Sequence, residues 1–73
     1  MANTDVKSDI AGKVWRIDAQ IGQALDEDDA ILTLESMKME IPVVAPIAGT
    51  LAELLVGEGD AIGEGQVVAR LQE

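Results

Sequence analysis

The chain has neither cysteine nor histidine, and Trp15 is the one aromatic residue among its 73. The absence of cysteine excludes disulfides and thiolate metal ligands, and the absence of histidine removes the commonest general base and the usual zinc ligand. A catalytic centre would have to be built from Asp, Glu, Lys and Ser, with a single aromatic side chain to wall a pocket. The composition therefore argues against a catalytic domain.

Positive charge is also scarce. Five basic residues face 14 acidic ones, which gives a net charge of −9. Such a chain lacks the basic surface that binds nucleic-acid phosphates or anionic membranes, and its self-repulsion favours a soluble monomer. No apolar run approaches membrane-spanning length, and the polar segment 1–5 is unlike a signal peptide. The expected compartment is the cytoplasm, with no nucleic-acid or membrane partner.

The second half of the chain repeats the first. Advanced by 37 residues, the sequence aligns with itself without a gap, so that Ile-Ala-Gly at 10–12 falls on Ile-Ala-Gly at 47–49. Two repeats are too few for a solenoid. The halves, about 4–36 and 39–72, are therefore expected to pack against each other about an approximate two-fold axis, in one domain of residues 1–73.

Local patterns within each half indicate strands. Apolar residues alternate with period two through 41–47, and the halves end on the aliphatic runs 31–34 and 67–71. A helix over 19–34 would fit its own spacing, but the equivalent segment 57–71 carries four glycines. The predicted fold is all-β, a flattened barrel or sandwich of two four-stranded antiparallel sheets, with strands at 4–8, 12–17, 24–25, 30–36, 39–44, 49–54, 61–62 and 66–71.

Lys38 lies where the two halves join. The strands 30–36 and 39–44 leave only Met37 and Lys38 between them, which predicts a two-residue hairpin far from both ends of the chain. Such turns need positive φ and favour Asn or Gly, so a lysine there is locally disfavoured. A residue that breaks a local rule in this way indicates function.

The residues around this hairpin resemble a known family. Residues 35–39 read Glu-Ser-Met-Lys-Met, preceded by Gly-Gln-Ala-Leu at 22–25 and followed by Ala-Pro-Ile-Ala-Gly at 45–49 and Gly-Glu-Gly-Asp at 57–60. The motif, its spacing and the internal repeat are similar to the biotin carboxyl carrier, or biotinyl-lipoyl attachment, family of the biotinyl type. The resemblance covers essentially residues 4–72.

Membership of that family implies that Lys38 is amide-linked to biotin by a biotin protein ligase, which supplies the activated biotinyl-adenylate. Met37 and Met39 are then partly exposed flanks that the ligase recognises, where the alternative is that they are core residues. Glu35 is either an edge-strand charge or a contact for the ligase or another partner.

The resemblance also implies a non-catalytic carrier. The biotin arm would take carboxyl groups from a biotin carboxylase site to a carboxyltransferase site, for transfer to an acyl-CoA or a keto acid. Three other interpretations stay open: a lipoyl carrier, whose lysine typically follows Asp where Met37 stands here, an acceptor of either biotin or lipoate, and an unmodified structural adaptor.

Some positions depart from the family pattern. Asp28 stands where the repeat has Gly65, and Asp tolerates left-handed backbone better than most residues. Asp9 stands where the repeat has Pro46, which affects only the start of a strand. The gapless repeat leaves no room for the thumb insertion of some members, and the Met start with a full repeat favours a free-standing protein. The acidic segment 26–29 lacks calcium-loop spacing and reads as a solvated turn, and Trp15 as a packing residue or surface contact.

Overall fold

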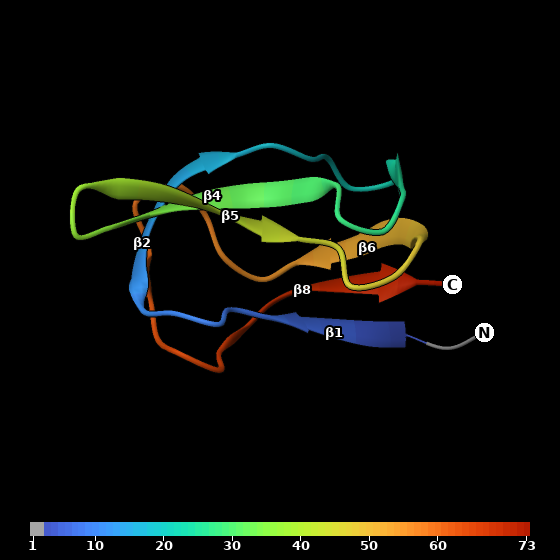
Figure 1. The fold of residues 1–73 in the computed structure, drawn as a ribbon. Coiled ribbons are helices and arrows are strands. Elements are labelled where there is room, and N and C mark those ends of the chain that lie inside the picture. Colours follow the sequence, from blue (N-terminus) through green and yellow to red (C-terminus); the bar gives the residue numbers. More distant parts are fainter. Residues whose placement is uncertain (1–2) are drawn as a thin grey trace.

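The computed structural model describes residues 3–73, which form eight β-strands (Figure 1). The strands make two four-stranded antiparallel sheets, so the predicted all-β fold class is confirmed. Their bounds are β1 Asn3–Lys7, β2 Gly12–Ile17, β3 Ala24–Leu25, β4 Ala30–Ser36, β5 Met39–Val44, β6 Gly49–Leu54, β7 Ala61–Ile62 and β8 Val67–Gln72. No helix with the length and hydropathy to cross a membrane occurs among these residues.

Each sheet takes strands from both halves of the chain. One has the order β1-β8-β6-β3 and the other β5-β4-β2-β7. The repeat relates β1 to β5, β8 to β4, β6 to β2 and β3 to β7, so an approximate two-fold axis exchanges the two sheets. Because β1 pairs with β8 and β4 with β5, neither half could complete a sheet by itself.

The loops obey the same two-fold relation in most of their backbone hydrogen bonds. In the first half the N–H of Gly22 donates to the carbonyl of Leu51 at 2.7 Å, and in the second the N–H of Gly59 donates to that of Val14 at 2.8 Å. Gly22 and Gly59 both have positive φ, 91° and 89°, which glycine adopts at little cost. The loops thus tie each half onto the other.

The core lies between the sheets and is aliphatic. Its buried residues are Val6, Val14, Ala19, Leu25, Ile31, Leu32, Leu34, Val43, Ala45, Leu51, Ile62, Val68, Ala69 and Leu71. Ser8 and Thr33 are buried as well, but each is hydrogen-bonded, and no buried side-chain N or O in the described chain lacks a partner. This satisfaction matters because an unpaired buried polar group is costly.

Two strands differ by one residue from their predicted positions. β1 was expected at 4–8 and runs over Asn3–Lys7, and β8 was expected at 66–71 and runs over Val67–Gln72. Ser8 ends β1 because its hydroxyl donates to the carbonyl of Ile10 and so turns the chain. The N–H of Ser8 donates to the carbonyl of Gln66 at 3.0 Å, a loop-to-loop bond that lies outside both strands.

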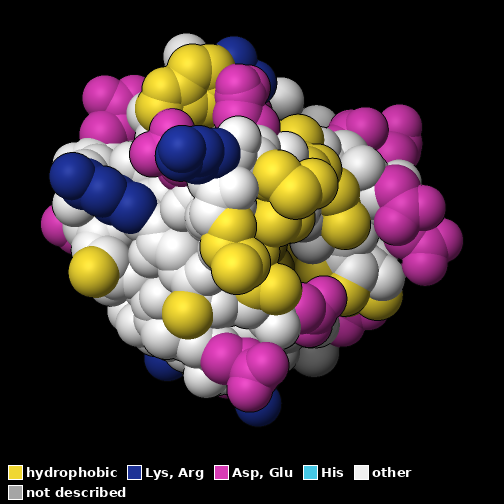
Figure 2. Space-filling model, turned by 60° about the vertical axis from the view of Figure 1, so that its left-hand side comes forward, with side chains coloured by type: hydrophobic (Ala, Val, Ile, Leu, Met, Phe, Trp, Pro, Cys, Tyr) yellow, Lys and Arg dark blue, Asp and Glu magenta, His cyan; other side chains and the backbone are white. Residues whose placement is uncertain are grey.

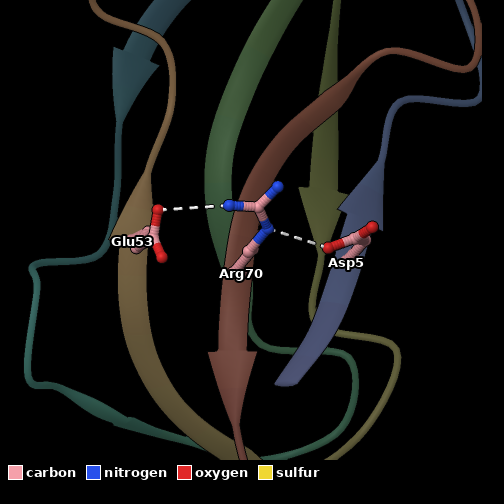
Figure 3. Close-up of polar contacts among 3 residues, drawn as sticks. All are labelled: Asp5, Glu53 and Arg70. Atoms are coloured by element: carbon pink, nitrogen blue, oxygen red, sulfur yellow. Dashed lines mark hydrogen bonds and ion pairs between the residues drawn. The ribbon is translucent and has the colours of Figure 1, made fainter.

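An ion-pair triad crosses the outer face of the first sheet (Figure 3). Arg70 on β8 donates to Asp5 on β1 at 3.0 Å and to Glu53 on β6 at 3.3 Å. The hydrogen bond to Asp5, together with the negative charge of Glu53, raises the pKa of the Arg70 guanidinium above its ordinary value. The guanidinium therefore stays charged and links three strands at the surface.

The molecule is elongated, with extents of 36 × 18 × 18 Å. The β4–β5 hairpin forms one end, and the start of β1 and the end of β8 lie together at the other (Figure 1). At that far end Asn3 pairs with Gln72 in the β1–β8 ladder. Residues 37 and 38 thus lie at the opposite end of the molecule from that pair.

Candidate functional site

Met37 and Lys38 form the two-residue turn predicted from the sequence. Ser36 and Met39 close the hairpin as a pair, and the residues between them have φ values of 52° and 66°. Two successive positive φ values define the primed turn that matches the twist of a hairpin. Because neither residue is Gly or Asn, the turn holds side chains that its backbone disfavours, which is typical of a functional site.

The Lys38 side chain is exposed, and among residues 3–73 it makes no hydrogen bond and no ion pair. The other lysines also lie at the surface, but on strands: Lys7 on β1 and Lys13 on β2. Only the amine of Lys38 is presented at an apex, where a partner can approach it from several directions.

The two methionines beside Lys38 are solvent-exposed. Met37 is 92% exposed and Met39 63%, so the core alternative for these residues is wrong. Figure 2 brings this end of the molecule forward and shows hydrophobic side chains gathered on it, with acidic side chains around them. Exposed methionines are flexible and polarisable, and they suit a surface that binds another protein.

Glu35 lies on β4, which is an interior strand of its sheet. The interpretation of Glu35 as an edge-strand charge is therefore wrong. Its register partners are Glu40 on β5 and Lys13 on β2, and all three side chains are exposed. Two carboxylates directly opposite each other repel, and Lys13 on the other side partly offsets this. The pair places negative charge on the outer face just below the hairpin tip.

The hairpin is fixed by close packing just below its turn. A Cβ on Gly12 would lie 2.9 Å from the carbonyl oxygen of Glu35, so only glycine lets β2 approach β4 this closely. On the inner face Leu34 is fully buried, and Ile41, its register partner, is partly buried. The hairpin is therefore a rigid extension of the sheet up to its turn.

The stacking of Arg16 on Trp15, near the site, was not predicted from the sequence, which left Trp15 as either a packing residue or a surface contact. Trp15 lies in a β-bulge of β2, where the register shifts between Val14 and Arg16, and it is 47% exposed. Arg16 stacks on the indole with its guanidinium carbon 4.8 Å from the ring centroid. Trp15 is thus a surface residue and not a core residue. The repeat could have indicated that this position needs no large side chain for packing, because Ala52 stands at the equivalent position.

The segment 26–29 forms a turn that the Asp29 side chain closes by a hydrogen bond to the backbone. Its carboxylate accepts the N–H of Asp26 at 2.9 Å, and the backbone N–H of Asp29 donates to the carbonyl of Asp26 at 3.1 Å. No group of three acidic residues able to hold a metal ion occurs in the part of the chain that the structure describes.

Two grooves run along the seam between β1 and β5, with volumes of about 450 and 110 Å³. Neither is lined by residues 37–39, so neither groove holds a group next to Lys38. The hairpin itself offers a free amine at an exposed tip. That arrangement fits a cofactor attached through a covalent bond.

Comparisons with known proteins agree with this geometry. Residues 2–71 match the family model described as biotin-requiring enzyme. The chain is 38% identical over 66 residues to the biotin/lipoyl attachment protein of Bacillus subtilis (strain 168), covering 90% of each chain. It is also 38% identical over 65 residues to the biotinylated protein TB7.3 homolog of Mycobacterium leprae (strain TN), covering 89% of this chain and 92% of that one.

A solved structure gives the same result in three dimensions. The urea carboxylase of Kluyveromyces lactis contains a region that superposes with a TM-score of 0.93 at 26% sequence identity. The match covers 99% of this chain and 6% of the urea carboxylase. The fold, the exposed lysine hairpin and these relatives lead to one conclusion: the chain belongs to the biotin/lipoyl attachment family.

Proposed function

We propose that this domain is a biotin carboxyl carrier and that Lys38 is the residue to which a biotin protein ligase attaches biotin. The observation that carries the proposal is the position of Lys38 at the apex of a rigid hairpin, exposed and without a polar partner in residues 3–73. Met37 and Met39 are the flanks that the ligase recognises, and Glu35 is a contact below them.

The chain's part in the modification is to present one nucleophile. Lys38 Nζ must lose a proton before it can attack, and an exposed amine gives that proton to a base of the ligase or to water. Nζ then attacks the activated carboxyl carbon that the ligase holds, an amide bond forms, and AMP leaves. The rigid hairpin contributes by orienting the amine, since small misplacements of a reacting group are costly in rate.

Lys38 would hold biotin through an amide bond, and the bound biotin would supply a ring nitrogen able to carry a carboxyl group from a biotin carboxylase site to a carboxyltransferase site. The tether keeps the cofactor at an effective concentration on the order of millimolar at both sites. The acceptor is an acyl-CoA or a keto acid, and the domain works in the cytoplasm. The fold supports this role because the arm extends from one end of a stiff molecule.

A lipoyl carrier is the second candidate. It is favoured by the combined biotin and lipoyl name of the Bacillus subtilis relative. The hairpin would present Lys38 to a lipoyl ligase in the same way, so the geometry does not separate the two cofactors. An acceptor of both cofactors is the remaining form of this candidate, and the residues beside Lys38 decide between them.

The test of the proposal is the mass of the protein after incubation with a biotin protein ligase, ATP and biotin. We expect one biotin per chain in the wild type and none in Lys38→Arg, which keeps the charge and removes the acceptor amine. Lys7→Arg and Lys13→Arg are matched controls and should be modified like the wild type. Labelling that persisted in Lys38→Arg would refute the site.

A second experiment separates the two cofactors. Replacing Met37 with Asp places beside Lys38 the residue typical of lipoyl domains and leaves the fold unchanged, because Met37 is 92% exposed. If flanking residues discriminate between ligases, this change should shift modification from biotin towards lipoate when both ligases compete. An unchanged product ratio would mean that recognition lies elsewhere on the domain.

A further inference from the structure

The exposed Trp15 is not needed by the fold. Its two-fold equivalent, Ala52, lies in the same kind of bulge on β6, where the register shifts between Leu51 and Glu53. The second half of the molecule therefore builds this element without an aromatic side chain. Exposing almost half of an indole also leaves a large apolar surface in water. The residue is thus placed on the surface of the hairpin sheet for a reason other than packing.

Trp15 is held in a fixed orientation. Arg16 covers one face of the indole, and Arg16 Nε donates to Asp18 Oδ1 at 2.6 Å. Asp18 Oδ2 in turn accepts from the hydroxyl of Thr33 at 2.7 Å, and Thr33 is only 5% exposed. This chain of contacts anchors the stacked guanidinium to the buried part of β4. An aromatic platform with one face covered by a clamped cation is pre-organised to stack a ring on its open side.

The platform lies within reach of an arm on Lys38. Val14, next to Trp15, pairs with Leu34 on β4, and Lys38 is four positions further along that hairpin. At a rise of about 3.3 Å per residue, the separation along the strands is about 13 Å. A lysine side chain extended by the five-carbon chain of biotin has about 11 bonds from Cα to the ring and spans about 14 Å. The two lengths agree.

We propose that Trp15 is a docking site on which the biotinyl ring rests when the arm on Lys38 is not engaged by a partner. The inference rests on the proposed function, since it needs biotin on Lys38. The apolar edge of the bicyclic ring packs on the open side of the indole. The contact is weak, but the tether raises the effective concentration of the ring near Trp15, so the contact still forms. The docked ring is partly withdrawn from water and is released when a partner binds it.

The single tryptophan is its own probe, because the chain has no tyrosine and no phenylalanine. The experiment compares the full chain with and without biotin, loading being established by mass. We expect the emission of the loaded protein to shift to shorter wavelength. Its quenching by acrylamide should fall about twofold, as expected if the ring covers the one open face of the indole.

The repeat supplies a matched control. In the double variant Trp15→Ala with Ala52→Trp, the indole moves to the equivalent bulge of the other sheet, beyond the reach of the arm. Loading should leave its emission and quenching unchanged. Equal quenching of loaded and unloaded wild type, with one biotin present by mass, would overturn the docking site and leave the proposed function intact. Absence of biotin on Lys38 would overturn both.

A second readout does not depend on fluorescence. In biotin-loaded Trp15→Leu the biotinyl ring has no indole to dock on, so it stays exposed to solvent. Its capture by avidin should therefore be about twofold faster than for the loaded wild type. Leu55→Ala removes a comparably exposed apolar side chain, 44% exposed, just after β6 and should leave the capture rate unchanged. Equal capture rates for wild type and Trp15→Leu would contradict the inference.

Discussion

Asp28 has a backbone conformation that glycine has in the second half of the chain. Its φ is 73°, and that of its two-fold equivalent, Gly65, is 80°. Both N–H groups donate to a facing carbonyl, Asp28 to Ala45 at 2.8 Å and Gly65 to Ser8 at 2.7 Å. The turn therefore has the same conformation with Asp as with Gly, in agreement with the tolerance of Asp for left-handed backbone noted from the sequence. Asp tolerates left-handed backbone at a cost that glycine does not incur.

Asp28→Gly should increase the free energy of unfolding by about 0.5–1 kcal/mol, because it removes this backbone strain and keeps the hydrogen bond to Ala45. The reciprocal change, Gly65→Asp, should lower it by a similar amount. Urea unfolding of both variants measures the effect. A loss of stability in Asp28→Gly would show that the carboxylate stabilises the turn by more than its conformation costs.

The close approach of β2 to β4 at Gly12 has a two-fold equivalent, the approach of β6 to β8 at Gly49. A Cβ on Gly12 would meet the carbonyl of Glu35 at 2.9 Å, and one on Gly49 would meet that of Gln72 at the same distance. In both places the contact is with backbone oxygen, which cannot turn aside as a side chain can. The two glycines therefore have the same structural role, but only Gly12 lies below the Lys38 hairpin.

Gly12→Ala and Gly49→Ala should each destabilise the domain by about 1–3 kcal/mol, the usual cost of overpacking. If Lys38 is biotinylated as proposed, only Gly12→Ala should also slow that modification at a temperature where both variants are folded, because it moves β4 just below the turn. Thermal melts and initial rates of modification give the two quantities. Equal rates in the two variants would mean that the ligase is insensitive to the position of the hairpin.

The sequence alone predicted β2 to β7 with their observed bounds, since glycine, proline and acidic turns separate them in both halves. The Met37–Lys38 turn followed from the same pattern. Contacts that depend on long-range register could not be predicted in this way. Glu35 faces Glu40, and Trp15 stacks with Arg16 in a bulge. Both contacts are set by the register between neighbouring strands. A one-residue bulge shifts the alternation of apolar residues, so Val14 and Ile17 stand three positions apart, but that spacing does not say which side chains come into contact.

The charge of the whole molecule is strongly unbalanced. The net charge is −9, while among residues 3–73 the ion pairs are Arg16 with Asp18 and Arg70 with Asp5 and Glu53. All of these involve exposed arginines, and such pairs contribute little. Repulsion between the remaining carboxylates therefore outweighs the attraction within the pairs, and screening by salt should stabilise the fold.

We expect the melting temperature to rise by roughly 4–8 °C between about 0.01 and 0.5 M sodium chloride, equivalent to about 1 kcal/mol for a domain of this size. Neutralising Glu27, Glu58 and Glu64 with Gln should raise the low-salt melting temperature and reduce the response to salt. These three residues are exposed and form no side-chain hydrogen bond in the described structure. A melting temperature that fell with salt would show that the few ion pairs dominate.

The two-fold relation between the halves also determines how many turns of this kind the fold can form. The pair equivalent to β4 and β5 is β8 and β1, which are the last and first strands, so no hairpin turn can join them. The fold therefore has one lysine-bearing turn, at one end of its long axis. If Lys38 carries the cofactor as proposed, a domain of this topology is monovalent: it presents one arm and must leave one partner site before it enters the next.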